Sequence, residues 1–201
     1  MYNIAIMSDY VFKRKVFTIK ELIDENTKVV ERKGKLFKVQ HFSDAKEFDK
    51  TLRINKVFST SGIQVPKIRF LNKKENDIIF DHIEGDSIVE KLQYGDLPEE
   101  IYDELFKMYW RCKQEKIELD FNPLNFVFSG GKLYYLRTIY TIVQDRAEGQ
   151  EKFLNKDLRL WFYTKEAVEF LKQNGLKTEG TLEEEYATNK RITLMCVKYY
   201  K

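Results

Sequence analysis

Two consecutive stretches decide the fold of this chain: Asp120-Phe121-Asn122-Pro123-Leu124-Asn125, and then Phe126-Val127-Phe128-Ser129-Gly130-Gly131-Lys132-Leu133-Tyr134-Tyr135-Leu136. Pro123 breaks regular structure in the first stretch, and Gly130 with Gly131 favours a tight turn between two apolar runs in the second. The pattern predicts a polar loop followed by a short β-hairpin. Taken alone, the spacing of Asp120 and Asn125 is also typical of a surface loop whose side chains only hydrogen-bond the turn, so the neighbouring segments must decide.

The neighbouring segments divide into a strand-rich part and a helix-rich part. Roughly alternating apolar and polar residues predict strands of a small antiparallel sheet over 10–17, 19–23, 28–31 and 35–41, with Lys33-Gly34 as a hairpin turn. Ser43 and Asp44 predict the start of a helix that ends near 59–62, and two more strands are expected at 65–70 and 77–81. Beyond Ser87 we expect helices over 88–93, after Pro98, and over 152–162, 164–174 and 182–199.

Composition and charge restrict the class of protein. The chain has 201 residues, of which 43% are hydrophobic and 14% aromatic, so we expect one folded domain, or one domain with two lobes. Its 35 Lys and Arg against 32 Asp and Glu leave a formal net charge of +3, which is too balanced for a dedicated nucleic-acid binder. A local basic patch stays open, because the runs Lys13-Arg14-Lys15 and Lys73-Lys74 suit either an RNA or acidic partner or a solvated strand edge.

Cysteine and histidine residues are few, and no long apolar run occurs. Cys112 and Cys196 lie far apart and outside any C-x-x-C spacing, which predicts neither a disulfide framework nor a zinc site. His41 and His82 are too few for a histidine-based metal site or a nucleophilic triad, and we expect structural roles for them. Because no stretch of about 18 apolar residues is present, we expect no membrane span, no secretion signal and a cytoplasmic location.

The loop and hairpin resemble the catalytic loop of kinase-fold phosphotransferases, in particular the aminoglycoside phosphotransferase-like and lipopolysaccharide-kinase-like members. The resemblance implies that Asp120 is the base that orients the attacking hydroxyl, that Asn125 is a magnesium ligand, and that ATP is the phosphate donor. It also implies an α+β, two-lobed protein-kinase-like fold. In that fold a small antiparallel β-sheet lobe covers 1–85, a mainly helical lobe covers 86–201, and the nucleotide binds between them.

Further landmarks of this family occur in the expected order. The sequence Lys35-Leu36-Phe37-Lys38-Val39 resembles the third strand of the small lobe, which implies that Lys38 contacts the α and β phosphates. The alternative for Lys38 is an exposed strand lysine. The segment 78–88 is similar to the hinge between the lobes, which implies that backbone groups of Asp81, His82 and Ile83 contact adenine.

Three positions depart from the family pattern. Arg137 stands where the family has its metal-binding Asp, and a guanidinium cannot be a ligand of magnesium. Thr51 falls near the position of the helix glutamate that pairs with the third-strand lysine, although Glu47, one helical turn earlier, would substitute for it. The turn 24–27, which should cover the phosphates, contains no glycine.

These departures lead to three hypotheses. The first is a pseudokinase that binds a nucleotide or a protein partner, in which Arg137 neutralises phosphates directly or pairs with Asp120 or Asn125. The second is an active ATP-dependent phosphotransferase acting on a hydroxyl of a small molecule, of a sugar or lipid head group, or of a protein, in which another acid such as Asp145 reaches the metal. The third is a protein-binding scaffold whose cleft is filled by Arg137 and binds no nucleotide.

Overall fold

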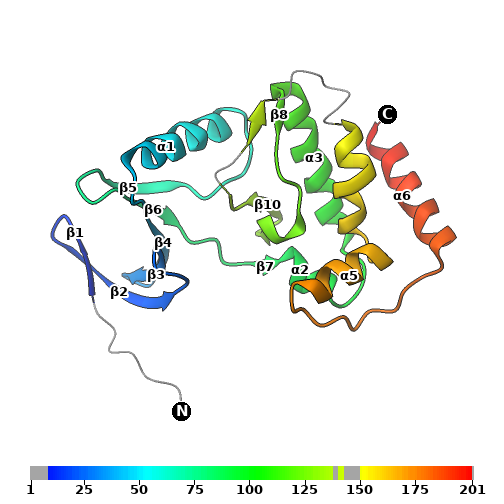
Figure 1. Ribbon diagram of the computed structural model, residues 1–201, viewed down its shortest axis with the longest axis horizontal. Coiled ribbons are helices and arrows are strands. Elements are labelled where there is room, and N and C mark those ends of the chain that lie inside the picture. The colour runs from blue at the N-terminus through cyan, green and yellow to red at the C-terminus, as the bar shows by residue number, and fades with distance from the viewer. Residues whose placement is uncertain (1–8, 138–139, 143–149, 201) are drawn as a thin grey trace, which may run out of the picture. The chain divides into compact units, whose positions relative to one another are not determined.

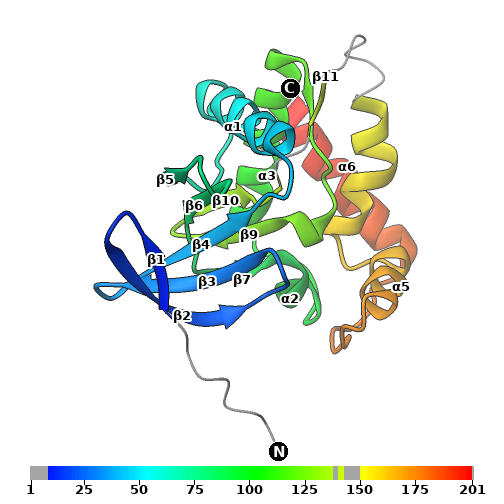
Figure 2. The same cartoon turned by 60° about the vertical axis from the view of Figure 1, so that its left-hand side comes forward.

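The structure is a computed structural model that describes residues 9–137, 140–142 and 150–200. Its contacts divide the chain into two compact units, the first comprising Met1–Lys56 and Pro66–Ile83 and the second Val57–Val65 and Glu84–Lys201. The first unit is an antiparallel sheet with one helix, and the second is mainly helical with one three-stranded and one two-stranded sheet of short strands (Figures 1 and 2). This is the α+β kinase-like fold expected from the sequence.

The boundary between the units differs from the expected division at residues 85 and 86, because helix α1 (Ala45–Thr60) runs from the first unit into the second. The end of α1 packs on the hairpin that follows the loop, where the ring of Phe58 meets Tyr135 edge-on at 5.8 Å. The backbone N–H of Tyr135 also donates to the carbonyl of Gln64 at 2.9 Å. The segment Val57–Val65 therefore belongs with the second unit.

The sheet of the first unit has six strands in the order β1-β2-β3-β4-β6-β5, and every neighbouring pair is antiparallel. Helix α1 follows β4 along the chain and precedes β5 (Figure 1). The strands are β1 (Asp9–Phe12), β2 (Lys15–Leu22), β3 (Thr27–Arg32), β4 (Lys35–His41), β5 (Ile68–Asn72) and β6 (Asp77–Asp81).

The prediction of one strand over 10–17 is wrong, because the chain turns back at Lys13 and Arg14. Because Phe12 pairs with Lys15, Lys13 and Arg14 form a two-residue hairpin loop between them. Both have positive φ, 44° for Lys13 and 64° for Arg14, which is the pattern of a type I′ turn. Neither residue type is common in such a turn, and the sequence therefore carries no local signal for it.

The sheet is strongly curled, and its concave face encloses an aromatic core. Strands β1 and β5 are the two edges, yet the rings of Phe12 and Phe70 lie only 5.9 Å apart. Phe17 also contacts Phe70, at 6.4 Å, and Phe37 edge-on at 5.8 Å. The opposite face packs against α1, where Phe48 joins a second buried cluster with Phe42, Ile78 and Phe80.

Strand β1 is held in place by a buried carboxylate at the start of β6. The hydroxyl of Tyr10 donates to Oδ2 of Asp77 at 2.6 Å, and Nδ1 of His41 lies 2.9 Å from Oδ1. Burial, and then the hydrogen bond to the Asp77 carboxylate, raise the pKa of Tyr10 well above its ordinary value. This contact gives His41 the structural role expected for it.

The second unit has an aromatic core built around helix α3. Tyr109 of α3 stacks on Phe153 at 4.2 Å, and Trp161 lies fully buried against Phe126. Cys112 is also buried in this core. The elements are β7 (Asp86–Ser87), α2 (Ile88–Leu92), α3 (Glu99–Glu115), β8 (Ile117–Glu118), η1 (Pro123–Asn125), β9 (Phe126–Ser129), β10 (Lys132–Tyr135), β11 (Thr141–Ile142), η2 (Phe153–Asp157), η3 (Leu158–Trp161), α5 (Lys165–Gln173) and α6 (Glu185–Tyr200).

Two features of this unit bear on the expected helices. Helix α5 ends close to the predicted residue 174: Gly175 has a φ of 72°, and the amide of Leu176 donates back to the carbonyl of Leu171. The segment expected to form a helix over 152–162 is helical to Trp161, but it is not a regular α-helix: residues 150–152 are α-helical and continue as the π-helical segment η2 and then the 3₁₀ segment η3. Among the described residues, no helix is long and apolar enough to cross a lipid bilayer.

Candidate functional site

The loop that precedes β9 is fixed by its own hydrogen bonds and by one buried tryptophan. Nε1 of Trp161 donates to the carbonyl of Phe121 at 2.8 Å. The side chain of Asn122 accepts from the amide of Leu124 at 3.0 Å and caps the short turn η1, which begins at Pro123. The chemistry of proline and asparagine thus sets the local turn, and the aromatic core holds it in position.

The hairpin returns the chain to the loop and brings Arg137 to Asp120. The amide of Leu136 donates to the carbonyl of Asn125 at 2.9 Å, so the next residue lies beside the loop. Nη1 of Arg137 then lies 2.9 Å from Oδ2 of Asp120. The other carboxylate oxygen, Oδ1, accepts from the amide of Asn122 at 3.2 Å, so both oxygens of Asp120 have partners.

Asn125 is buried and also bound to the loop. Its Nδ2 donates to the backbone carbonyl of Asp120 at 3.0 Å, which leaves the side-chain oxygen as the atom that could face a cation. The structure therefore brings Asp120, Asn125 and Arg137 together. Of the two partners expected for Arg137, its guanidinium contacts the carboxylate of Asp120.

The residues present do not fit a magnesium ion at this loop. Such a site needs several oxygen ligands of net negative charge, whereas the guanidinium of Arg137 occupies one oxygen of Asp120 and adds a positive charge beside it. A cation bound there would have to displace this ion pair. Among the described residues, no three His, Cys, Asp or Glu side chains gather as a metal site. The alternative ligand Asp145 lies outside the described residues.

Two further acids, Glu118 and Asp157, lie near the loop, and nothing in their sequence spacing groups Asp157 with it. Glu118 forms an ion pair with Lys152. Asp157, at the end of η2, is almost fully buried, and burial raises its pKa to about 6, with the negative charge of Asp120 adding to the rise and Lys152 opposing it. Their proximity depends on the π-helical turn η2, which has no simple sequence signal.

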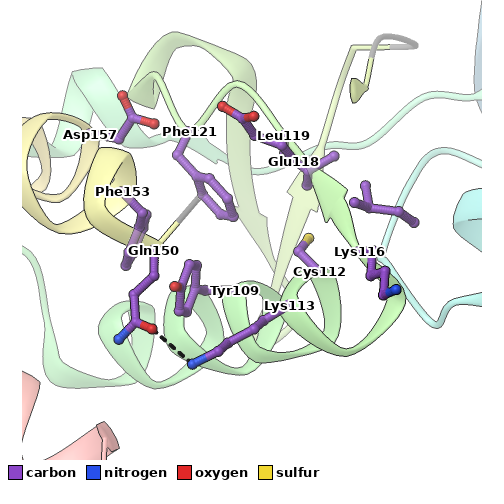
Figure 3. Close-up of a pocket in the computed structure, with 11 residues that line it drawn as sticks. Tyr109, Cys112, Lys113, Lys116, Glu118, Leu119, Phe121, Gln150, Phe153 and Asp157 are labelled. Atoms are coloured by element: carbon purple, nitrogen blue, oxygen red, sulfur yellow. Dashed lines mark hydrogen bonds between the residues drawn. The ribbon is translucent and has the colours of Figure 1, made fainter. Parts of the chain in front are cut away.

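A small cavity of about 30 Å³ lies behind the loop (Figure 3). Figure 3 shows the carboxylates of Glu118 and Asp157 along its upper side, with the rings of Tyr109, Phe121 and Phe153 below. This volume corresponds to about one water molecule, so the cavity is far too small for a nucleotide. Burial raises the pKa of the Cys112 thiol in its wall to about 12, which favours the protonated thiol over the nucleophilic thiolate at neutral pH.

The candidate phosphate-binding residues belong to the first unit. Lys38 lies in the middle of β4 on the same face as Phe80, and burial lowers the pKa of its amine, which the carboxylate of Asp24 partly offsets. Glu47 is exposed in the first turn of α1. It forms no ion pair with Lys38 among the described residues. The pairing expected between Glu47 and Lys38 is therefore not formed, and the acid that acts on Lys38 comes from the turn between β2 and β3.

The expected hinge residues have contacts of their own within the first unit. The amide of Asp81 donates to the carbonyl of Lys67 at 2.8 Å, and that of His82 to Leu36 at 3.4 Å. Burial would raise the pKa of the Asp81 carboxyl, but the hydrogen bond and charge of Arg69, with help from Lys35, hold it below its usual range. Ile83 is half-buried and ends the unit. Contact of these three residues with adenine stays a prediction.

Comparison with known proteins supports the fold and goes no further. In sequence, no family model and no curated protein matches the chain. Among solved structures, it is similar to the co-crystal structure of WbdD and the kinase inhibitor LY294002, with a TM-score of 0.57 and 9% sequence identity, over 96% of this chain and 47% of that chain. The chain thus spans about half the length of that protein. The similarity shows a kinase-like fold.

Proposed function

We propose that this chain is a pseudokinase: a kinase-like protein that acts by binding a partner or nucleotide, without magnesium-dependent phosphate transfer. The observation that carries the proposal is the ion pair between Arg137 and Asp120. An active loop needs a free carboxylate for the attacking hydroxyl and acidic ligands for the metal. Here the position expected for the acid holds a guanidinium, and that guanidinium is bonded to the carboxylate expected to act as base.

A second observation in the first unit supports the same proposal. The turn between β2 and β3, which would cover the phosphates, carries Asp24 and Glu25 and has no glycine. Negative side chains in this turn repel phosphate, and Asp24 instead offsets the effect of burial on Lys38. Both candidate charged residues, Lys38 and Asp120, therefore have an opposite charge supplied by the chain itself.

The competing function is an active ATP-dependent phosphotransferase, and one specific observation favours it. The loop retains Asp120 and Asn125, and the hydrogen bond between Nδ2 of Asn125 and the Asp120 carbonyl leaves the amide oxygen available. If Arg137 moved away from Asp120 when substrates bind, this loop would regain a base and one metal ligand. The two functions differ in whether Arg137 blocks the metal.

The test is to restore the acid that the family has at this position. Arg137→Asp removes the guanidinium and places a carboxylate beside Asn125, so we expect the variant to gain an ATP-dependent rise in melting temperature that requires Mg²⁺ and is absent in EDTA. The wild-type protein should show no such requirement. If wild type already shows it, or transfers phosphate in an Asp120-dependent manner, the active-kinase function replaces our proposal.

Arg159→Asp is the matched control. Arg159 forms a bidentate ion pair with Glu166 in the same unit, so this variant also exchanges an arginine for an aspartate and breaks one ion pair. Because Arg159 lies away from the loop in sequence and contacts, we expect no gain of Mg²⁺ dependence. A gain of equal size in both variants would attribute the effect to net charge and would contradict the role given to Arg137.

A further inference from the structure

One end of the sheet in the first unit carries a concentration of positive charge that the proposed function does not use. The β1–β2 turn at Lys13-Arg14 and the β3–β4 turn at Lys33-Gly34 both lie at this end (Figure 2, left). They are neighbours because Thr18 of β2, close to the first turn, pairs with Glu31 of β3, close to the second. We call this surface the basic end. It consists of Lys13, Arg14, Lys15, Arg32 and Lys33.

The cations of the basic end have no carboxylate partners among the described residues, although other cations of this unit do. Lys20 is paired with Glu31, and Lys35 and Arg69 share Asp81. Aromatic rings of the core lie under several cations of the basic end instead: Nζ of Lys15 stands 4.1 Å from the centre of the Phe70 ring, and Lys13 and Arg32 face Phe12 and Phe17. A ring contact does not neutralise a cation, so these charges stay uncompensated within the described residues and can attract an outside anion.

The backbone at the tip of this end adopts angles that its basic residues do not favour. Lys13 and Arg14 both adopt left-handed φ angles, where Asn-Gly would fit at lower cost. The neighbouring turn again has a lysine, Lys33, at positive φ before Gly34. Two adjacent turns therefore carry basic residues in a conformation that does not favour them, which indicates that their side chains serve a purpose.

The partner must also suit two exposed valines beside the tip. Val11 and Val16 pair across the hairpin on its outer face and are 62% and 53% exposed. The rings of this end, in contrast, are turned into the core, with Phe12 and Phe17 buried. A basic surface that binds single-stranded nucleic acid normally offers exposed rings for stacking, whereas cations around exposed aliphatic side chains suit the head groups and upper acyl region of a bilayer.

We propose that the basic end docks on an anionic lipid surface, with the hairpin tip of β1 and β2 entering the interface. The cations contact lipid phosphates and carboxylates, and the two valines lie at the level of the upper acyl chains. No part of the chain needs to span the bilayer for this. The proposal is independent of the fate of the metal site, since all its residues lie in the first unit.

The test measures co-sedimentation of the full chain with phosphatidylcholine vesicles that contain or lack phosphatidylserine. We expect binding only with phosphatidylserine, and we expect Lys13→Asn combined with Arg14→Gly to weaken it about 25-fold, since each cation near such a surface contributes about fivefold. This pair restores a favourable type I′ turn, so the variant stays folded, as thermal unfolding can verify. Val11→Thr combined with Val16→Thr should weaken binding severalfold at unchanged charge.

The matched control is Lys73→Asn combined with Lys74→Asn. These lysines lie in the turn between β5 and β6, at the opposite end of the sheet, and their loss changes the net charge by the same amount. We expect vesicle binding to stay within about twofold of wild type. The proposal is overturned if vesicles are not bound, if both lysine variants lose binding equally, or if a single-stranded RNA oligonucleotide is bound through Lys13 and Arg14 while vesicles are not.

Discussion

Arg137 differs in charge by two units from the aspartate that the resemblance implies, and its position could be found by counting along the sequence. The hydrogen-bond partner of Arg137 could not be found in this way, because Asp120 and Asn125 lie close to each other in the sequence and both can accept a hydrogen bond from a guanidinium. The structure selects Asp120 through the hydrogen bond from Leu136 to Asn125, which fixes where the hairpin ends. The effects of Asp24 on Lys38 and of Asp120 on Asp157 depend on tertiary contacts that no spacing reveals.

Asp157 gives a residue-scale prediction about stability and pH. Its pKa is about 6 in the folded protein against an ordinary value of 3.8, so the folded state holds the proton more tightly than the unfolded state. The stability that this proton contributes is complete below the ordinary pKa and is lost as the pH rises through about 6. Asp157→Asn should therefore raise the free energy of unfolding at neutral pH by on the order of 1 kcal/mol, after allowance for solvent screening.

Urea unfolding across this pH range measures the effect. Wild type and Asp157→Asn should converge in stability at acidic pH and diverge as the pH rises, while Asp49→Asn, at an exposed position of α1, should show no such divergence. A difference between wild type and Asp157→Asn that stays constant with pH would show that the carboxyl of Asp157 does not titrate in this range.

At the scale of elements, three two-residue hairpin turns show what the sequence could and could not predict. Two of these turns could be predicted from Gly34 and from the pair Gly130-Gly131, since glycine accepts positive φ without strain. The third, at Lys13 and Arg14, has the same backbone pattern with two long side chains, and the alternation on either side of it hides the reversal. Apolar periodicity and capping residues predicted the other strands of the sheet and the helices α1, α3 and α5.

The strained turn yields an element-scale prediction. Replacing Lys13 by Asn and Arg14 by Gly should raise the free energy of unfolding by about 1 kcal/mol, because these residues accept left-handed φ angles at lower cost. Guanidinium unfolding checks it, and the slope against denaturant should stay unchanged. If the double variant is less stable than wild type, the contacts of Lys13 with the Phe12 ring outweigh the strain, and the account of the turn fails.

At the scale of the whole molecule, the nearly balanced net charge conceals an uneven distribution. The chain carries a formal charge of +3, yet its first unit gathers cations without carboxylate partners at the basic end, whereas the acids Asp24, Glu25, Glu75 and Asp77 line a cavity of about 340 Å³ at the opposite end of the sheet. Composition alone excluded a dedicated nucleic-acid binder and left a local patch open. Only the strand order and the positions of the turns show where that patch lies.

Each of the two units contains residues on which the proposed pseudokinase function rests. The first contributes Lys38 with Asp24 and the acidic turn, and the second contributes the loop with Asp120, Asn125 and Arg137. The similarity to WbdD covers nearly the whole of this chain and shows the fold that contains both parts. The function depends on whether the loop accepts a divalent ion.

The most direct measurement is thermal unfolding of the wild-type protein with and without ATP, each in Mg²⁺ and in EDTA. A ligand at about 100 times its dissociation constant stabilises a folded protein by roughly 2.7 kcal/mol, which is several degrees for a domain of this size. Our account predicts that any shift caused by ATP is the same in Mg²⁺ and in EDTA, because Arg137 takes the place of the metal ligand. A shift that appears only with Mg²⁺ would contradict it.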